Sequence, residues 1–183
     1  MKLIGTPLGG VFIIEPDVYK DERGYFLETY RKSFFAELLK GSYGFLQDNE
    51  SLSSKGVLRG IHYQLPPFAQ AKLVRVVCGA VFDVAVDLRK SSPNFGKWFG
   101  LELSSENKRQ LFIPRGFGHG FVALKDGTVV AYKVDNYYNK DSDRGVRFDD
   151  KDINIDWPFD VNELIISEKD KSLPLLSNAD VFE

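Results

Sequence analysis

Two histidines, His62 and His119, are the side chains of this sequence best suited to proton transfer. An imidazole titrates at about pH 6.5 in water, so either histidine can take up or release a proton near neutral pH. Arg59 lies three residues before His62, and glycines at 60, 116, 118 and 120 surround the two histidines. Glycine allows the backbone to bend or to approach a ligand closely. A lone histidine in a strand is usually structural, but these surroundings predict a functional site.

The same two histidines restrict the chemistry. A three-histidine metal site cannot be built from one chain that has only two, and positions 60 and 64 beside His62 are glycine and glutamine. Metal sites on β-strands need three or four histidine or carboxylate ligands. We therefore expect no metal, and acid–base work by side chains alone. Such work needs a base, a group that stabilises an anion, and an acid.

Composition excludes several other classes of protein. The formal net charge is −2, so the chain lacks the basic field that holds proteins on nucleic acid or anionic membrane. An anionic small molecule would need a local cationic pocket. Cys78 is the only cysteine, and no apolar stretch is long enough to span a bilayer. These features predict a soluble, cytoplasmic protein that binds neither nucleic acid nor membrane.

The elements that must hold these residues are short strands. Val-rich segments at 72–77 and 81–88 flank Cys78, Gly79 and Ala80, which predicts a tight hairpin of two buried strands. Further strands are predicted at 11–14, 25–30, 98–103, 109–113, 120–124 and 129–134. One helix is predicted, with Ser33 as its N-cap, Phe34, Phe35, Leu38 and Leu39 on one face, and Gly41 just past its end.

Many short strands at regular spacing indicate a sandwich or a closed barrel. At 183 residues, one domain is the default. We therefore expect one all-β domain of residues 1–183, a sandwich or a closed barrel such as a jelly roll, with its core at about 44–135, one short N-terminal helix and an irregular C-terminal tail.

Several segments together resemble the dTDP-4-dehydrorhamnose 3,5-epimerase family. The match is colinear from about Gly24 to Asp170, and its most specific segments are 47–51, 56–64, 70–76, 82–89 and 113–121. The resemblance implies a cupin-type jelly roll, usually a homodimer, that acts on a nucleotide sugar without a cofactor.

The resemblance also implies roles for individual residues. His62 is expected to be the general base, Asp170 the carboxylate that orients it, Lys72 the group that neutralises an enolate oxygen, and Tyr132 the acid. The remaining positions are expected to bind substrate; they are Arg23, Phe26, Glu28, Gln47, Asn49, Arg59, His119, Tyr138, Asp143 and Lys169. Many family members have Glu where this chain has Asp143.

Structural interpretations compete with some of these roles. Tyr132 is also a typical sheet aromatic, and Lys72 at a strand end can extend its ammonium to solvent. Asp83 and Asp87 alternate within a strand and are expected to pair with Arg75 or Arg89, outside the site. Strict alternation places Arg59 and His62 on opposite faces of their strand, which a bulge at Gly60 would reconcile.

The main functional prediction is inversion of C3 and C5 of dTDP-4-keto-6-deoxyglucose, which gives dTDP-4-keto-rhamnose. The alternatives are a relative that inverts C3 alone, a non-catalytic module that binds a sugar nucleotide, and a metal-dependent cupin oxygenase. The small number of histidines argues against the last.

Overall fold

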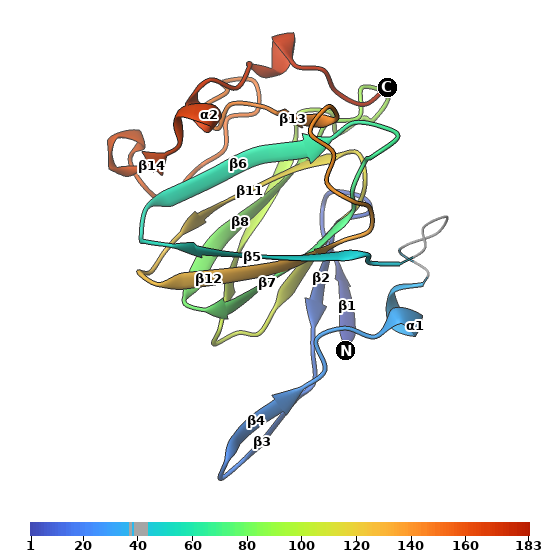
Figure 1. Cartoon of the computed structure of the whole chain (residues 1–183), viewed down its shortest axis with the longest axis vertical. Helices are drawn as coiled ribbons and strands as arrows, with labels where there is room; N and C mark the ends of the chain where they lie inside the picture. The colour runs from blue at the N-terminus through green and yellow to red at the C-terminus, as the bar shows by residue number, and fades with distance from the viewer. Residues whose placement is uncertain (37, 39–43) are drawn as a thin grey trace.

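The computed structural model describes residues 1–36, 38 and 44–183, which form two large β-sheets packed face to face (Figure 1). The first sheet has the order β1-β2-β10-β7-β12-β5. Its strands are β1 (Lys2–Gly5), β2 (Phe12–Glu15), β10 (Gln110–Ile113), β7 (Lys72–Cys78), β12 (Thr128–Val134) and β5 (Gln47–Ser53). The second sheet has the order β13-β6-β11-β8-β9, with β14 beside β6. Its strands are β13 (Asp143–Gly145), β6 (Val57–Gln64), β11 (Phe117–Ala123), β8 (Ala80–Asp87), β9 (Trp98–Ser104) and β14 (Ile165–Ile166).

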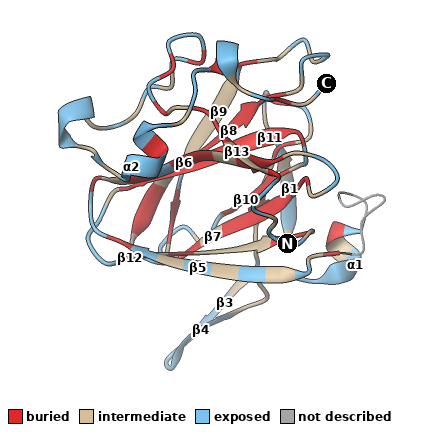
Figure 2. Ribbon diagram, turned by 45° about the horizontal axis from the view of Figure 1, so that its top comes forward, coloured by how far each residue is buried: buried red, intermediate tan, exposed pale blue. Residues whose placement is uncertain are grey.

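Apolar side chains of the two sheets meet between the layers. Val74 and Val130 of the first sheet belong to one buried cluster with Val81, Ala85 and Phe121 of the second. Figure 2 shows the buried residues along the central strands, whereas the hairpin formed by β3 (Val18–Asp21) and β4 (Gly24–Leu27) is mostly exposed. Burying this apolar surface is the main favourable term in folding. The result is a cupin-type jelly roll, which confirms the predicted fold class.

The predicted hairpin between 72–77 and 81–88 is wrong. Strand β7 pairs with β10 and β12, whereas β8 pairs with β11 and β9 in the other sheet. The chain changes sheets at Gly79, whose φ is +78° and where an added Cβ would lie 2.3 Å from Thr128 Oγ1. A Val-rich strand indicates burial on both faces, and that pattern does not say which strand is its partner. The other predicted strands are present, within a few residues of the expected limits.

The N-terminal helix is shorter than predicted. It is α1 (Lys32–Phe35), so Ser33 lies inside it, and Arg31 occupies the N-cap position without a side-chain cap. Phe35 is fully buried and belongs to a cluster with Leu73 and Phe112 on the outer face of the first sheet. Packing of this aromatic side chain holds the single turn in place, since so short a helix has little stability of its own. Leu39 and Gly41 lie outside the described residues.

The C-terminal tail crosses the outer face of the second sheet. It contains the turns η1 (Val161–Glu163) and η2 (Leu176–Asn178) and the one-turn helix α2 (Glu168–Lys171). Strand β14 pairs in parallel with the start of β6, opposite Val57 and Leu58. The tail is therefore fixed beside the strand that carries His62. Among the described residues, no helix has the length and apolar character needed to cross a membrane.

A two-stranded hairpin projects from the body of the molecule (Figure 1). It consists of β3 (Val18–Asp21) and β4 (Gly24–Leu27). Tyr19, Tyr25 and Phe26 are 64%, 55% and 70% exposed. Isolated two-stranded hairpins are only marginally stable in water.

Close packing in the second sheet predicts that Gly118→Ala destabilises the protein. An added Cβ would lie 2.4 Å from Ile61 Cγ2 and 2.9 Å from Leu88 Cδ1, and both side chains are fully buried. We expect the free energy of unfolding, measured by urea denaturation, to fall by about 1–3 kcal/mol because of this overpacking. Gly9→Ala is the matched control, because nothing lies within 4 Å of an added Cβ there. Equal stabilities of the two variants would contradict the packing described.

Candidate active site

Two adjoining cavities lie where the two sheets face each other, with volumes of about 240 and 430 Å³. Four residues line both cavities: His62, Lys72, Tyr132 and Lys169. Lys72 and Tyr132 come from the first sheet, and His62 comes from the second. The three side chains predicted as base, anion stabiliser and acid therefore border one space.

His62 forms a close pair with Asp170, since its Nε2 lies 3.0 Å from Asp170 Oδ1. The carboxylate lies on α2, where its own backbone N–H is capped by Ser167 Oγ, and its Oδ2 accepts the Gly60 N–H at 3.3 Å. Burial raises the pKa of Asp170, but the hydrogen bond and charge of His62 and the Gly60 N–H outweigh it and hold the pKa below its usual value. A carboxylate only accepts hydrogen bonds, so Nε2 carries the hydrogen and Nδ1 is left free to take a proton.

A bulge at Gly60 places Arg59 and His62 on the same side of β6, as predicted. His119 of β11 pairs with His62, and Phe121 pairs with Arg59. An advance of two residues along β11 therefore lies opposite an advance of three residues along β6. Gly60 has a φ of +126°, and an added Cβ would lie 2.5 Å from Gly120 Cα. Only glycine fits there. Both Arg59 and His62 consequently line the larger cavity.

Lys72 is buried, so the interpretation of a strand-end lysine reaching solvent is wrong. The residue is 8% exposed, and its Nζ donates to the backbone oxygen of His62 at 3.2 Å. Burial lowers the pKa of Lys72 to about 8, against the opposing charges of Asp83 and Asp143. A buried ammonium that lines the cavity is well placed to stabilise a developing negative charge.

Tyr132 faces His62 from the opposite sheet. It lies on β12 between Val74 of β7 and Asn49 of β5, and its ring centroid is 6.4 Å from that of His119. Burial raises the pKa of Tyr132. Its phenol therefore stays protonated at neutral pH, which a proton donor requires.

Asp83 was predicted to lie outside the site, but it contacts His119, a residue that lines the larger cavity. It is fully buried, and it pairs with His119 rather than with Arg75 or Arg89, because its Oδ2 lies 3.0 Å from His119 Nε2. The predicted partner was correct for Asp87, which binds Arg89. Alternation of Asp83 with apolar residues pointed to an inward carboxylate, but its partner lies 36 residues away and no local pattern identifies it.

The smaller cavity gathers five of the predicted binding residues: Gln47, Asn49, Tyr138, Asp143 and Lys169. Gln47 connects two of them, since its side chain donates to Asn49 Oδ1 and accepts the Tyr138 N–H. Lys169 Nζ lies 2.7 Å from Asp143 Oδ2. The shorter Asp143 side chain therefore still reaches a cation of the site. Arg59 and His119 line the larger cavity.

Seven lining residues were not predicted, namely Glu50, Ser51, Tyr63, Gln64, Gln70, Phe121 and Ser167. Most lie within the strands that carry the predicted residues or beside them. Some could have been predicted by counting alternate residues along a strand from a predicted site residue, because these share one face. Among the described residues, no three His, Cys, Asp or Glu side chains gather closely enough to hold a metal ion.

Three predicted binding residues are not brought to these cavities within one chain. Arg23 and Phe26 lie on the projecting β3–β4 hairpin, where they line a separate surface hollow. Arg23 pairs with Asp21, and Glu28 pairs with Arg31. The single chain therefore does not bring these three residues to the candidate site.

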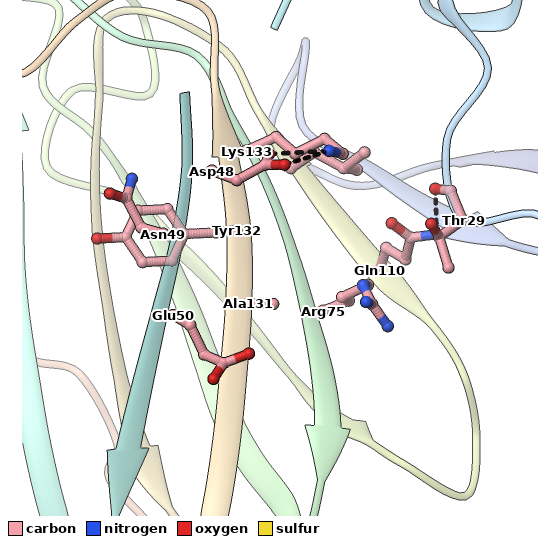
Figure 3. A pocket seen from close by; sticks show the side chains of 10 residues that line it. Thr29, Asp48, Asn49, Glu50, Arg75, Gln110, Ala131, Tyr132 and Lys133 are labelled. Atoms are coloured by element: carbon pink, nitrogen blue, oxygen red, sulfur yellow. Dashed lines mark hydrogen bonds and ion pairs between the residues drawn. The ribbon is translucent and has the colours of Figure 1, made fainter. Parts of the chain in front are cut away.

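A further cavity of about 300 Å³ lies on the first sheet beside the strands of the site (Figure 3). Its lining residues are Thr29, Asp48, Asn49, Glu50, Leu73, Arg75, Gln110, Ala131, Tyr132 and Lys133. Successive side chains of a strand point to opposite faces, so Ala131 and Lys133 lie on the outer face when Tyr132 faces the core. Lys133 pairs with Asp48, and His62 and Asp170 do not reach this cavity. It is therefore not the candidate active site.

Comparison with known proteins shows which family the chain resembles. A family model described as dTDP-4-dehydrorhamnose 3,5-epimerase matches residues 5–178. A protein of that name from Shigella flexneri is 53% identical over 182 residues, which are 100% of this chain and 99% of the relative. The crystal structure of the epimerase from Elizabethkingia anophelis has a TM-score of 0.92 and 53% identity and covers 97% of each chain.

A second solved structure was determined with a sugar nucleotide bound. It is an epimerase from Legionella pneumophila in complex with dTDP-4-keto-L-rhamnose, with a TM-score of 0.92 and 46% identity, covering 98% of this chain and 94% of the other. From the extent and the identity of these matches, the chain belongs to the dTDP-4-dehydrorhamnose 3,5-epimerase family.

Proposed function

We propose that this chain is an isomerase that inverts C3 and C5 of dTDP-4-keto-6-deoxyglucose through enolate intermediates and gives dTDP-4-keto-rhamnose. The observation that carries the proposal is the meeting of His62, Lys72 and Tyr132 around one sugar-sized space. Membership of the epimerase family supports the same reaction.

The ketone at C4 makes the chemistry possible. It acidifies the hydrogens on both neighbouring carbons, because removal of either one gives an enolate. His62 removes the proton through the nitrogen that Asp170 leaves free, and Lys72 stabilises the negative charge that develops on O4. The charge on O4 is greater in the transition state than in the ketone, so this ammonium lowers the barrier.

Inversion needs a proton to leave one face of the sugar and another to arrive on the opposite face. His62 lies on β6 of the second sheet, and Tyr132 lies on β12 of the first. A hexose held between the sheets has the base on one side and the phenol on the other. Turning the bound sugar ring within the cavity would present C3 and then C5 to the same pair.

Cationic side chains around the cavities suit a nucleoside diphosphate. Arg59 and Lys169 border the larger cavity, and an arginine fork matches phosphate oxygens. Tyr138 is 57% exposed at the rim of the smaller cavity, where its ring can stack on a base. The chain thereby binds its anionic substrate locally despite its net negative charge.

We further infer a homodimer in which the β3–β4 hairpin reaches the partner's site. This assembly would give Arg23 and Phe26 the substrate contacts that they cannot make in their own chain. The hairpin also adjoins the outer cavity, since Thr29 just beyond it lines that space. Gln110, 1% exposed there, donates to the Thr29 oxygen while its Oε1 has no partner among the described residues. An incomplete, aromatic-rich surface of this kind favours association.

We propose a single cytoplasmic domain that works without a metal or another cofactor and binds a small molecule rather than nucleic acid or membrane.

The proposed reaction predicts isotope exchange. In deuterated water, the protein should introduce deuterium at both C3 and C5 of dTDP-4-keto-6-deoxyglucose, measured by NMR. His62→Ala should slow this exchange by at least about 100-fold, because it removes the general base. The affinity of that variant for dTDP, measured by calorimetry, is the control and should be nearly unchanged. Label at C3 alone would identify a single-carbon epimerase, and binding without exchange would identify a non-catalytic module.

The buried lysine predicts an alkaline limit to activity. The pKa of Lys72 is about 8, so the ammonium is present below that pH and is lost above it. We expect kcat/KM to fall about tenfold per pH unit well above pH 8. Lys72→Arg should remove this decline, since a guanidinium stays charged, even though the variant is slower. Lys133→Met, which changes a lysine on the other face of the sheet, should retain it. A decline that persists in Lys72→Arg would assign it to another group.

Mixing experiments test the homodimer. His62→Ala and Arg23→Ala should each have low kcat/KM, because each lacks one part of every site. A heterodimer of the two has one site with both parts intact, so an equimolar, re-equilibrated mixture should recover about a quarter of the wild-type activity. Unmixed variants at the same total concentration are the control. No recovery despite confirmed subunit exchange would place Arg23 and His62 in separate functions or in the same chain's site.

A further inference from the structure

The pair of Asp83 and His119 has no part in the proton transfers proposed above. Asp83 lies on β8 and His119 on the adjacent strand β11, where His119 pairs with Ala85, two residues from Asp83. Their side chains are 0% and 6% exposed, and His119 Nε2 lies 3.0 Å from Asp83 Oδ2. His119 also lines the larger cavity, next to the proposed acid Tyr132.

The carboxylate determines which nitrogen of His119 carries a hydrogen. A carboxylate accepts and does not donate, so Nε2 must be the donor. Burial lowers the pKa of His119 more than Asp83 raises it, and the neighbouring Lys72 and His62 lower it further. The ring is therefore neutral, and its second nitrogen, Nδ1, has a lone pair and no hydrogen.

Nδ1 then selects the chemistry of its ligand. Among the described residues, none hydrogen-bonds to this atom. A lone pair repels a phosphate oxygen, which also only accepts, but it attracts a hydroxyl group. The bound hexose is the part of a sugar nucleotide that offers several hydroxyls.

We propose that Asp83 is a positioning residue that holds His119 as the neutral Nε2–H tautomer, so that Nδ1 accepts a hydrogen bond from a hydroxyl of the hexose. The identity of the ligand rests on the proposed function. The tautomer is a property of the free protein and can be tested without any turnover.

Nitrogen-15 NMR of the labelled imidazoles tests the tautomer. The chain has only two histidines, so His62→Asn assigns the remaining signals to His119. We expect at neutral pH a protonated Nε2 and an unprotonated Nδ1. A protonated Nδ1, in either the other neutral tautomer or an imidazolium, would overturn the proposal.

Two ligands then separate the hydroxyl from the phosphates. dTDP-quinovose has hexose hydroxyls but no ketone, so it binds without reacting. It should shift the Nδ1 signal of His119 in the direction of an accepted hydrogen bond, whereas dTDP alone should not. An equal shift with dTDP would assign His119 to the diphosphate and reject the proposal. These outcomes do not depend on exchange at C3 or C5.

Substitution of the carboxylate provides the kinetic test. Asp83→Asn can present either an oxygen or an NH₂ group, so we expect a mixture of His119 tautomers and a KM for the sugar nucleotide raised about tenfold, with a smaller change in kcat. Asp87→Asn is the matched control, because Asp87 is equally buried on β8 but pairs with Arg89 and Ser92. It should retain the wild-type tautomer and KM. A folded Asp83→Asn protein with the wild-type tautomer and KM would contradict the role of Asp83.

Discussion

The contact between His62 and Asp170 is the constraint on which the site depends, because it joins two parts of the chain that are separated by more than 100 residues. The ring is carried by a barrel strand, and the carboxylate is carried by a one-turn helix in the tail. Two features of β6 allow them to meet. Pairing with β14 fixes the tail beside the strand, and the bulge at Gly60 turns a backbone N–H toward Asp170 Oδ2. Without the tail, the imidazole would lack its orienting partner.

Local patterns predicted the strands well but not the way in which they associate. Val-rich segments mark buried strands because apolar side chains leave water, and this property is carried by each segment alone. The pairing of β7 with β12 and of β8 with β11 depends on contacts across the whole chain. The sheet change at Gly79 was therefore mistaken for a hairpin. Similarly, the expected N-cap at Ser33 was overridden by packing of Phe35 against the first sheet.

In the candidate site too, local patterns predicted some features, whereas others depend on contacts between distant parts of the chain. The bulge at Gly60 was predictable, because a glycine between two residues that must share a face is a local signal. The family resemblance, not a local pattern, suggested Asp170, and no signal paired Asp83 with His119. Burial of Lys72 was also beyond local reasoning, since a lysine at the start of a strand is usually solvated. Its low exposure results from the opposite sheet, whose His62 backbone oxygen accepts its hydrogen bond.

Two histidines, each 3.0 Å from a carboxylate, border one cavity, and their exposure distinguishes the roles proposed for them. The His62 side chain is 28% exposed, whereas that of His119 is 6% exposed. The more exposed His62 ring lines the cavity beside the Asp170 carboxylate, as the proposed base requires. At position 119, a protonated ring would place a second cation close to buried Lys72. This contrast favours His62 over His119 for the proposed proton transfer, and the constant charge of His119 suits the hydrogen-bond acceptor proposed for it. A site with two equally exposed histidines would lose this distinction, because either ring could then take the proton.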